Sequence, residues 1–321
     1  MIIVTGAAGF IGRHTALRLL ERGEQVVGVD EFNAYYDPAL KEARSAALME
    51  HPGFRMVRMD VADAEAFSDL LRQTGARRVV HLAAQAGVRY SLEQPFAYEH
   101  ANLRGHLSVL EACRHAPGFE HLVYASSSSV YGDRPADGGA FREDEPLTAP
   151  ASLYAATKQG CEMMSGAYGN LYGLAQTGLR FFTVYGPWGR PDMAYFIFTR
   201  RILAGEPIEV FGEGRMARDF TYVDDIVDGI LGALERPPPG GENRVLNIGD
   251  SRPVGLMRMI EVLEQALGRT AEKVMKPMQP GDVTSTFADV SRLHALTGYA
   301  PKVKLEEGIP RFVDWYRGYY G

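Results

Sequence analysis

Residues 1–12 read MIIVTGAAGFIG, and this stretch decides the fold. Its apolar start, Met1–Thr5, predicts a buried strand, and a helix-period pattern follows it. Three glycines, Gly6, Gly9 and Gly12, fall in the turn between the two. In such a turn the first glycine permits a tight bend, the second lets backbone N–H groups approach a pyrophosphate, and the third lets the helix pack against the strand. The stretch therefore predicts a phosphate-binding turn at the N-terminus of the first helix.

Short apolar runs alternate with helix-period stretches through most of the first 250 residues. Strands that are separated by crossover helices predict an α/β fold with a doubly wound parallel sheet, the Rossmann arrangement. Continuous apolar runs fit strands that are buried on both faces. After the first run, the expected strands are Gln25–Asp30, Phe54–Asp60, Arg78–Ala84, His121–Ser126, Ala175–Phe181 and Arg244–Ile248.

The pattern changes after about Tyr185, where Pro and Gly are more frequent and the helical pieces are shorter. We expect residues 1–185, with about 221–248, to form a dinucleotide-binding domain. Residues 186–220 and 249–321 are expected to form a smaller C-terminal substrate-binding domain. The PPPGG stretch that ends at position 241 is interpreted as a surface turn because it is short and lies between a helical stretch and a strand.

Composition restricts the class of protein. Hydrophobic residues make up 46% and charged residues 23% of 321 residues, a globular balance that excludes a disordered chain. The net charge of −6 argues against nucleic-acid or anionic-membrane partners. Two cysteines, Cys113 and Cys161, cannot build a disulfide framework or a structural zinc site, and no metal is expected. No apolar run reaches about 18 residues, and no signal sequence precedes the first strand. We expect a cytoplasmic protein.

Asp30 ends the second expected strand, about 20 residues beyond the glycine turn. A carboxylate there can accept hydrogen bonds from ribose hydroxyls and would repel a 2′-phosphate. NAD is therefore preferred to NADP as the cofactor. Asp60 and Val61, which follow the third strand, are weaker candidates for flanking the adenine.

Tyr154 and Lys158 stand four residues apart in YAATK, on one face of an expected helix. A free phenol has a pKa of roughly 10 and is a poor base at neutral pH, but a nearby ammonium group stabilises the phenolate. Ser126–Ser129 end an expected strand, at the edge where ligands bind in doubly wound sheets. Either motif alone can occur by chance. Together with the glycine turn they predict an acid–base site.

These motifs, with HLAAQAGVR (His81–Arg89) and ASSSSVYG (Ala125–Gly132), resemble those of the extended short-chain dehydrogenase/reductase family. Within it they resemble the nucleotide-sugar epimerases and dehydratases. The similarity runs from Met1 to about Tyr316, and it implies a structural role for His81. The catalytic residues that it implies are Ser127, Tyr154 and Lys158. The cofactor-binding residues that it implies are Gly6, Gly9, Phe10, Ile11, Gly12, Asp30, Asn33, Asp60, Val61, Leu82, Ala83, Ala84, Tyr154 and Lys158.

Two segments of the second half, GEPIEVFGEG (Gly205–Gly214) and ARDFTYVDDI (Ala217–Ile226), resemble the segments of this family that bind UDP. Arg218 matches an arginine that meets the diphosphate, and Asp282 matches a residue near the nucleotide. Arginine suits a diphosphate because its guanidinium is a planar fork of donors. The substrate-binding residues that the resemblance implies are Arg89, Ser128, Thr183, Arg190, Val210, Arg215, Arg218 and Asp282.

Three stretches are similar to those of UDP-glucuronate 4-epimerases: EFNAYYDPALKEAR (Glu31–Arg44), QAGVRYSLEQP (Gln85–Pro95) and RFFTVYGPWGRPDMA (Arg180–Ala194). Many UDP-glucose 4-epimerases and dehydratases have Asn at the position of Thr183. The resemblance implies reversible C4 epimerisation of UDP-glucuronate to UDP-galacturonate, through a 4-keto intermediate and with tightly bound NAD. A UDP-glucose 4-epimerase and a UDP-glucuronate decarboxylase remain the alternatives.

The family pairs two helices of each subunit into a four-helix interface. The matching stretches here lie near Phe96–His115 and Ser152–Leu171, and both carry apolar residues beyond what one core face requires. The resemblance therefore implies a homodimer.

Overall fold

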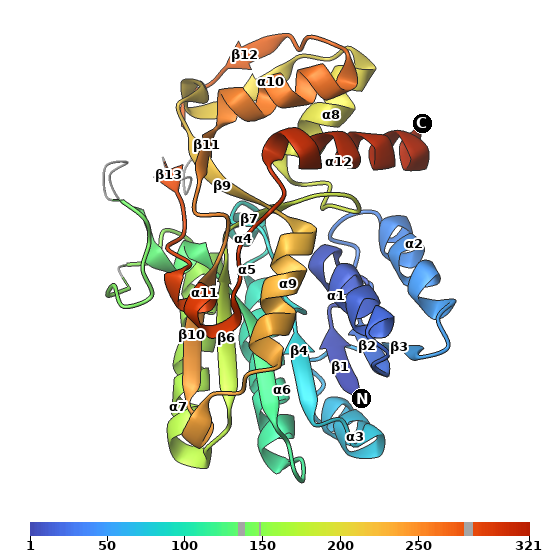
Figure 1. The fold of residues 1–321 in the computed structure, drawn as a ribbon, viewed down its shortest axis with the longest axis vertical. Coiled ribbons are helices and arrows are strands. Elements are labelled where there is room, and N and C mark those ends of the chain that lie inside the picture. Colours follow the sequence, from blue (N-terminus) through green and yellow to red (C-terminus); the bar gives the residue numbers. More distant parts are fainter. Residues whose placement is uncertain (134–138, 148, 279–284) are drawn as a thin grey trace.

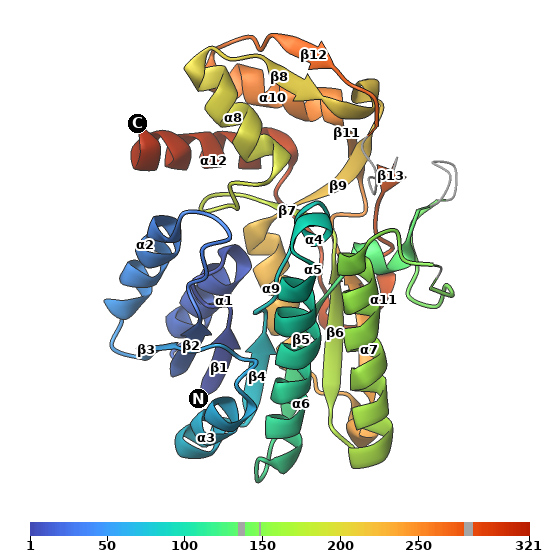
Figure 2. The same cartoon turned by 180° about the vertical axis from the view of Figure 1, so that it is seen from behind.

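The computed structural model describes residues 1–133, 139–147, 149–278 and 285–321. Its main sheet has seven strands in the order β10-β6-β5-β4-β1-β2-β3, and every neighbouring pair is parallel (Figure 1, Figure 2). The predicted α/β fold with a doubly wound parallel sheet is thus confirmed. These strands are β1 (Ile2–Thr5), β2 (Val26–Asp30), β3 (Phe54–Arg58), β4 (Arg78–His81), β5 (His121–Ser127), β6 (Gln176–Phe181) and β10 (Asn243–Ile248).

Both faces of the main sheet are buried under helices. Ile2 and Val4 of β1 pack into the cluster that includes α1 and α9, whereas Ile3 packs with Phe67 and Val109 of the opposite layer. The alternating directions of strand side chains explain why the whole of β1 is apolar. The covering helices are α1 (Phe10–Glu21), α2 (Pro38–Met49), α3 (Ala64–Thr74), α6 (Gly105–His115), α7 (Leu153–Tyr172), α9 (Val223–Leu234) and α11 (Ser291–Thr297).

The remaining segments lie beyond the carboxyl ends of the main strands (Figure 1). One small sheet joins β7, β9, β11 and β13, and a second pairs β8 with β12. The chain leaves the main sheet after β6, returns through α9 and β10, and leaves again. The PPPGG stretch forms a short 3-10 turn at Pro239–Gly241, which confirms its interpretation. These elements are β7 (Thr183–Tyr185), α8 (Ala194–Ala204), β8 (Ile208–Val210), β9 (Ala217–Tyr222), β11 (Pro253–Gly255), α10 (Leu256–Leu267), β12 (Lys273–Met275), β13 (Ser285–Thr286) and α12 (Leu305–Tyr320).

The helix expected near Phe96–His115 is divided. Short helices α4 (Tyr90–Glu93) and α5 (Pro95–Tyr98) lead into a π-helical turn, η1 (Glu99–Arg104), before α6 begins. Buried Asn102 in this turn accepts a hydrogen bond from the backbone N–H of Gln85 at 2.8 Å and donates to the carbonyl of Gln85 at 3.1 Å. It also donates to Thr157 of α7 at 2.9 Å. A widened turn lets one side chain reach both elements, which a regular pattern of apolar residues does not reveal.

No helix among the described residues is long and apolar enough to cross a membrane.

A buried ion pair holds α7 against β6. Arg180 donates through Nε and Nη2 to the two oxygens of Glu162, at 2.9 and 2.7 Å. Ser126, at the end of β5, also donates to Glu162. The charged side chains are only 5% and 7% exposed, so each charge depends on the other to offset the cost of removing it from water.

Glu162→Ala is expected to lower the free energy of unfolding by about 3–5 kcal/mol, because it leaves a buried guanidinium without its carboxylate. Urea denaturation measures the loss. Asp69→Ala is the control, since it removes the exposed pair with Arg72 and is expected to cost less than about 1 kcal/mol. Equal losses in the two variants would contradict this account of the buried pair.

Candidate active site

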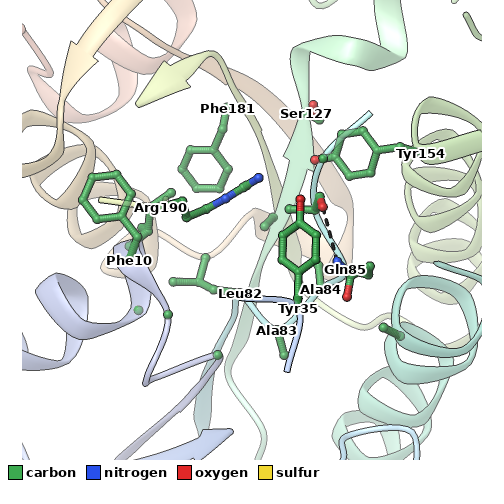
Figure 3. Close-up of a pocket in the computed structure, with 18 of the residues that line it drawn as sticks. Phe10, Tyr35, Leu82, Ala83, Ala84, Gln85, Ser127, Tyr154, Phe181 and Arg190 are labelled. Atoms are coloured by element: carbon green, nitrogen blue, oxygen red, sulfur yellow. Dashed lines mark hydrogen bonds between the residues drawn. The ribbon is translucent and has the colours of Figure 1, made fainter. Parts of the chain in front are cut away.

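A cavity of about 430 Å³ lies at the carboxyl edge of the main sheet (Figure 3). Its walls come from the ends of β1, β2, β4, β5 and β6. The order of the strands reverses between β1 and β4, and this is where doubly wound sheets bind ligands. All the residues expected to hold the cofactor line this cavity, and so do all three expected catalytic residues. Their individual contacts with a ligand stay predictions.

The glycine turn has no room for side chains. Gly6 has a φ of +69°, and a Cβ there would lie 2.8 Å from the backbone nitrogen of Ala83. A Cβ on Gly9 or Gly12 would lie 2.8 or 2.0 Å from the Gly6 carbonyl oxygen. Gly9 is the N-cap of α1 and offers no side-chain hydrogen bond to it. The free N–H groups of the first turn therefore fit the pyrophosphate of a dinucleotide.

Asp30 is placed to meet the ribose. One of its carboxylate oxygens accepts a hydrogen bond from the Ala8 N–H at 3.0 Å, and the other accepts one from Phe32 at 2.9 Å. Burial raises the pKa of Asp30, against the opposing effects of the Phe32 N–H and the Lys41 ammonium. Each oxygen accepts one backbone hydrogen bond here and keeps further acceptor capacity toward the cavity. This arrangement fits the donors of a dinucleotide ribose.

Asp60 is held in place by Ala62 and His100. It accepts a hydrogen bond from the Ala62 N–H at 2.8 Å, and its second oxygen lies 2.6 Å from Nε2 of His100. The carboxylate lines the cavity beside Val61. A contact of these two residues with an adenine stays a prediction.

Tyr154 and Lys158 lie one turn apart near the start of α7. Ser152 caps this helix by accepting a hydrogen bond from the Ala155 N–H at 3.1 Å. Buried Lys158 donates from Nζ to the Ala125 carbonyl of β5 at 2.9 Å, which ties the catalytic helix to the sheet. Tyr154 and Lys158 thus share one face of α7 at the cavity wall, and their acid–base roles stay predictions.

Ser127 ends β5 and faces the same cavity. Its Oγ accepts a hydrogen bond from the Ser129 N–H at 3.2 Å. Figure 3 shows Ser127 next to Tyr154 at the cavity wall. A hydroxyl and a phenol in this arrangement can share the hydrogen of a substrate hydroxyl.

His81 has the surroundings of a structural residue. Its Nδ1 lies 2.8 Å from Oγ1 of Thr5, and its ring stacks on that of His106. Burial lowers the pKa of His81 well below its ordinary value and that of His106 to about 3. Both rings are therefore neutral at physiological pH.

The residues expected to bind substrate fall into two groups. Ser128, Thr183 and Arg190 line the cavity, close to the reacting end. The described residues that line the cavity do not include the other four, which are Arg89, Val210, Arg215 and Arg218. Asp282 lies outside the described residues.

The second group gathers near β8 and β9 instead. The Arg89 guanidinium lies over the ring of Phe211, 5.4 Å from its centroid, and Arg218 donates to the Ala217 carbonyl. Arg215 is largely exposed and pairs with a neighbouring glutamate at 2.8 Å. The Val210 side chain is fully buried in the core, so only its backbone could meet a nucleotide. Roles in UDP binding stay predictions for all four residues.

Several cavity residues were missed by the sequence analysis. Most lie within the three stretches that resemble UDP-glucuronate 4-epimerases, which was the available signal, whereas Met59 and Ala101 lie outside them. Those within the stretches include Tyr35, Tyr36, Lys41, Gln85, Ala86, Gly87, Val88, Phe181, Phe182, Val184 and Met193. In the described part of the chain, no three His, Cys, Asp or Glu side chains form a cluster that could hold a metal ion.

Comparisons with known proteins give full-length matches. The chain is 46% identical to UDP-glucuronate 4-epimerase 3 of Arabidopsis thaliana, over 99% of this chain and 77% of that protein. A crystal structure of the UDP-glucuronic acid 4-epimerase from Bacillus cereus, with UDP-glucuronic acid and NAD, is similar with a TM-score of 0.92, at 36% identity and 99% coverage of both chains. The UDP-glucose 4-epimerase of Thermotoga maritima, with UDP-glucose, has a TM-score of 0.89 at 32% identity, over 100% and 99% of the two chains.

The family model described as the NAD dependent epimerase/dehydratase family matches residues 2–249. This range contains the whole main sheet, the glycine turn and the tyrosine–lysine pair. The chain therefore belongs to the NAD dependent epimerase/dehydratase family.

Proposed function

We propose that this protein interconverts UDP-glucuronate and UDP-galacturonate by inverting carbon 4 of the sugar. The observation that carries the proposal is the single cavity that Asp30, the glycine turn, Tyr154 and Thr183 share. The similarity to UDP-glucuronate 4-epimerases over nearly the whole chain supports it. The sequence identity to the Thermotoga maritima UDP-glucose 4-epimerase is lower.

NAD fits the cavity between the glycine turn and the catalytic helix. The α1 N-terminus would hold its pyrophosphate, and Asp30 would hold its ribose. When bound, NAD would supply a reversible hydride acceptor for carbon 4. The reaction has no net oxidation, so the protein must keep the cofactor in place throughout the cycle.

The protein's own residues move the proton. Tyr154 would remove the proton of the 4-hydroxyl and later return it, while Ser127 would donate a hydrogen bond to the same oxygen. Lys158 would stabilise the phenolate by its charge. The 4-keto sugar must rotate between removal of the hydride and its return. The protein therefore has to bind the nucleotide part of the substrate more firmly than the sugar ring.

The sugar carboxylate needs separate control. A 4-keto sugar acid is a β-keto acid, which loses carbon dioxide when the bond to the carboxylate aligns with the ketone π system. Ser128, Thr183 and Arg190 line this part of the cavity and would hold the carboxylate away from that alignment. This task separates a 4-epimerase from a decarboxylase.

The activity is tested by incubating the purified protein with UDP-glucuronate and no added NAD. We expect UDP-galacturonate to accumulate, separated by anion-exchange chromatography and identified by proton NMR. Formation of carbon dioxide and UDP-xylose would show a decarboxylase instead. Turnover of UDP-glucose alone would show a UDP-glucose 4-epimerase.

Tyr154→Phe is expected to lower kcat about 10²–10⁴-fold, because it removes the acid–base hydroxyl and little else. The cofactor content of the purified variant should equal that of the wild type. Tyr172→Phe, at the other end of the same helix, is the matched control and should keep normal turnover. Near-normal epimerisation by Tyr154→Phe would rule out the proposed proton transfer.

We also propose a homodimer. Exposed apolar side chains lie on the adjacent helices α5, α6 and α7, where Phe96 is 83% and Met163 is 74% exposed (Figure 2). A second copy would cover these side chains and so remove apolar surface from water. The cytoplasmic location and the two-domain division expected from the sequence stay predictions.

Light scattering after size exclusion tests the dimer. The wild type is expected at twice the mass of one chain, and the double variant Phe96→Asp, Met163→Asp at the mass of one chain, because two carboxylates would have to be buried. Met49→Asp places a charge on an exposed methionine of α2 and should leave the dimer intact. A monomeric wild type would contradict the proposal.

A further inference from the structure

Two of the stretches that resemble UDP-glucuronate 4-epimerases meet across the cavity. The Tyr35 hydroxyl, from the segment after β2, donates to Oδ2 of Asp192 at 3.0 Å. Asp192 in turn accepts from Nε of Arg190 at 3.0 Å and from its Nη2. Tyr35 and Arg190 both line the cavity, one from the cofactor side and one from the segment after β7. A chain of hydrogen bonds therefore joins the two sides.

A buried arginine fixes the segment that carries Arg190. The Arg44 guanidinium is 0% exposed and donates to the carbonyls of Trp188 at 2.6 Å and Gly189 at 3.0 Å. It also donates to the Ala8 carbonyl of the glycine turn at 3.3 Å. The backbone just before Arg190 is thus held relative to the cofactor site, while the Arg190 side chain is held by Asp192.

The opposite charges of Arg190 and Asp192 stabilise this arrangement, in which the two side chains are 25% and 30% exposed. Burial would lower the pKa of Arg190, but the Asp192 charge outweighs it and raises that pKa. Burial would raise the pKa of Asp192, but the Arg190 charge outweighs it and lowers that pKa. Burial and the Asp192 charge raise the pKa of Tyr35, which therefore stays a hydrogen-bond donor. A Cβ on Gly87, whose φ is +102°, would lie 2.7 Å from the Tyr35 hydroxyl, so the facing wall is closely packed.

The ion pair occupies Nε and Nη2 of Arg190, and Nη1 is the terminal nitrogen left for a ligand. Figure 3 shows the Arg190 guanidinium extending toward the part of the cavity where Tyr35 and Tyr154 lie. A cation that is already held in position loses little rotamer freedom when an anion binds, whereas a free arginine side chain would lose much more. The smaller loss of rotamer freedom strengthens binding of a substrate whose sugar carries a carboxylate. It has no effect on binding of a substrate whose sugar is neutral.

We propose that Tyr35 and Asp192 are positioning residues for Arg190, and that through it they set the preference for a sugar that carries a carboxylate. The inference rests on the proposed function. Tyr35 and Asp192 touch neither the reacting carbon nor the migrating proton in this account. Their effect is on binding of the carboxylate.

The test compares Tyr35→Phe and Asp192→Asn with the wild type by calorimetric titration of UDP-glucuronate and of UDP-glucose. Loss of a hydrogen bond to a charged group is expected to weaken the Kd for UDP-glucuronate about tenfold. The Kd for UDP-glucose should change less than about twofold. Tyr90→Phe is the matched control, because its ring packs on Tyr35 with centroids 4.6 Å apart, and it leaves the Tyr35 hydroxyl on Asp192.

Arg190→Lys provides a double-mutant cycle. If Tyr35 acts through Arg190, adding Tyr35→Phe to Arg190→Lys should weaken UDP-glucuronate binding less than about twofold further. Equal weakening for both sugars, full additivity, or the same loss in Tyr90→Phe would overturn the positioning role. Selective loss of UDP-glucuronate binding, with no UDP-galacturonate formed by the wild type, would keep that role and reject the proposed function. Normal epimerisation by the wild type, with unchanged binding of UDP-glucuronate in both variants, would keep the proposed function and reject the positioning role.

Discussion

The close approach of β1 and α1 at the glycine turn is the constraint on which the site depends. A Cβ on Gly12 would lie 2.0 Å from the Gly6 carbonyl oxygen, so the helix can begin beside the strand only without a side chain there. This approach turns the N-terminus of α1 toward the cavity, next to the ends of β4 and β5. The phosphate-binding groups and the acid–base groups then share one edge of the sheet, because parallel strands end together.

Buried polar side chains fix the catalytic helix to that edge. Asn102 links the segment after β4 to Thr157, the residue before Lys158 in α7. Glu162 of the same helix holds Ser126 and Arg180, and Lys158 itself holds the Ala125 carbonyl. These hydrogen bonds link α7 to β5, to β6 and to the segment after β4, and so restrict its position. The framework therefore fixes where Tyr154 and Lys158 lie at the cavity wall.

The sequence predicted the parts of the site that depend on local spacing. The glycine turn, Asp30 at a strand end and the Tyr–Lys pair on one helix face all follow from periodicity and from motifs, and the structure brings them together. Contacts between distant loops could not be predicted this way: the Tyr35–Asp192 bond depends on the path of two segments that spacing does not specify. The π-helical turn before α6 depends likewise on the hydrogen bonds of one buried side chain, Asn102, to residues distant in sequence. Val210 shows the same limit, since its side chain is buried by packing into the main hydrophobic core.

The proposed mechanism requires that the hydrogen of carbon 4 be removed and returned within one cavity. Epimerisation of UDP-glucuronate with deuterium at carbon 4, in ordinary water, tests it most directly. We expect UDP-galacturonate to keep the deuterium at carbon 4 in full, because in the proposed mechanism that hydrogen never exchanges with solvent. Replacement of the deuterium by solvent hydrogen would show that carbon 4 loses a proton instead, and would contradict the account.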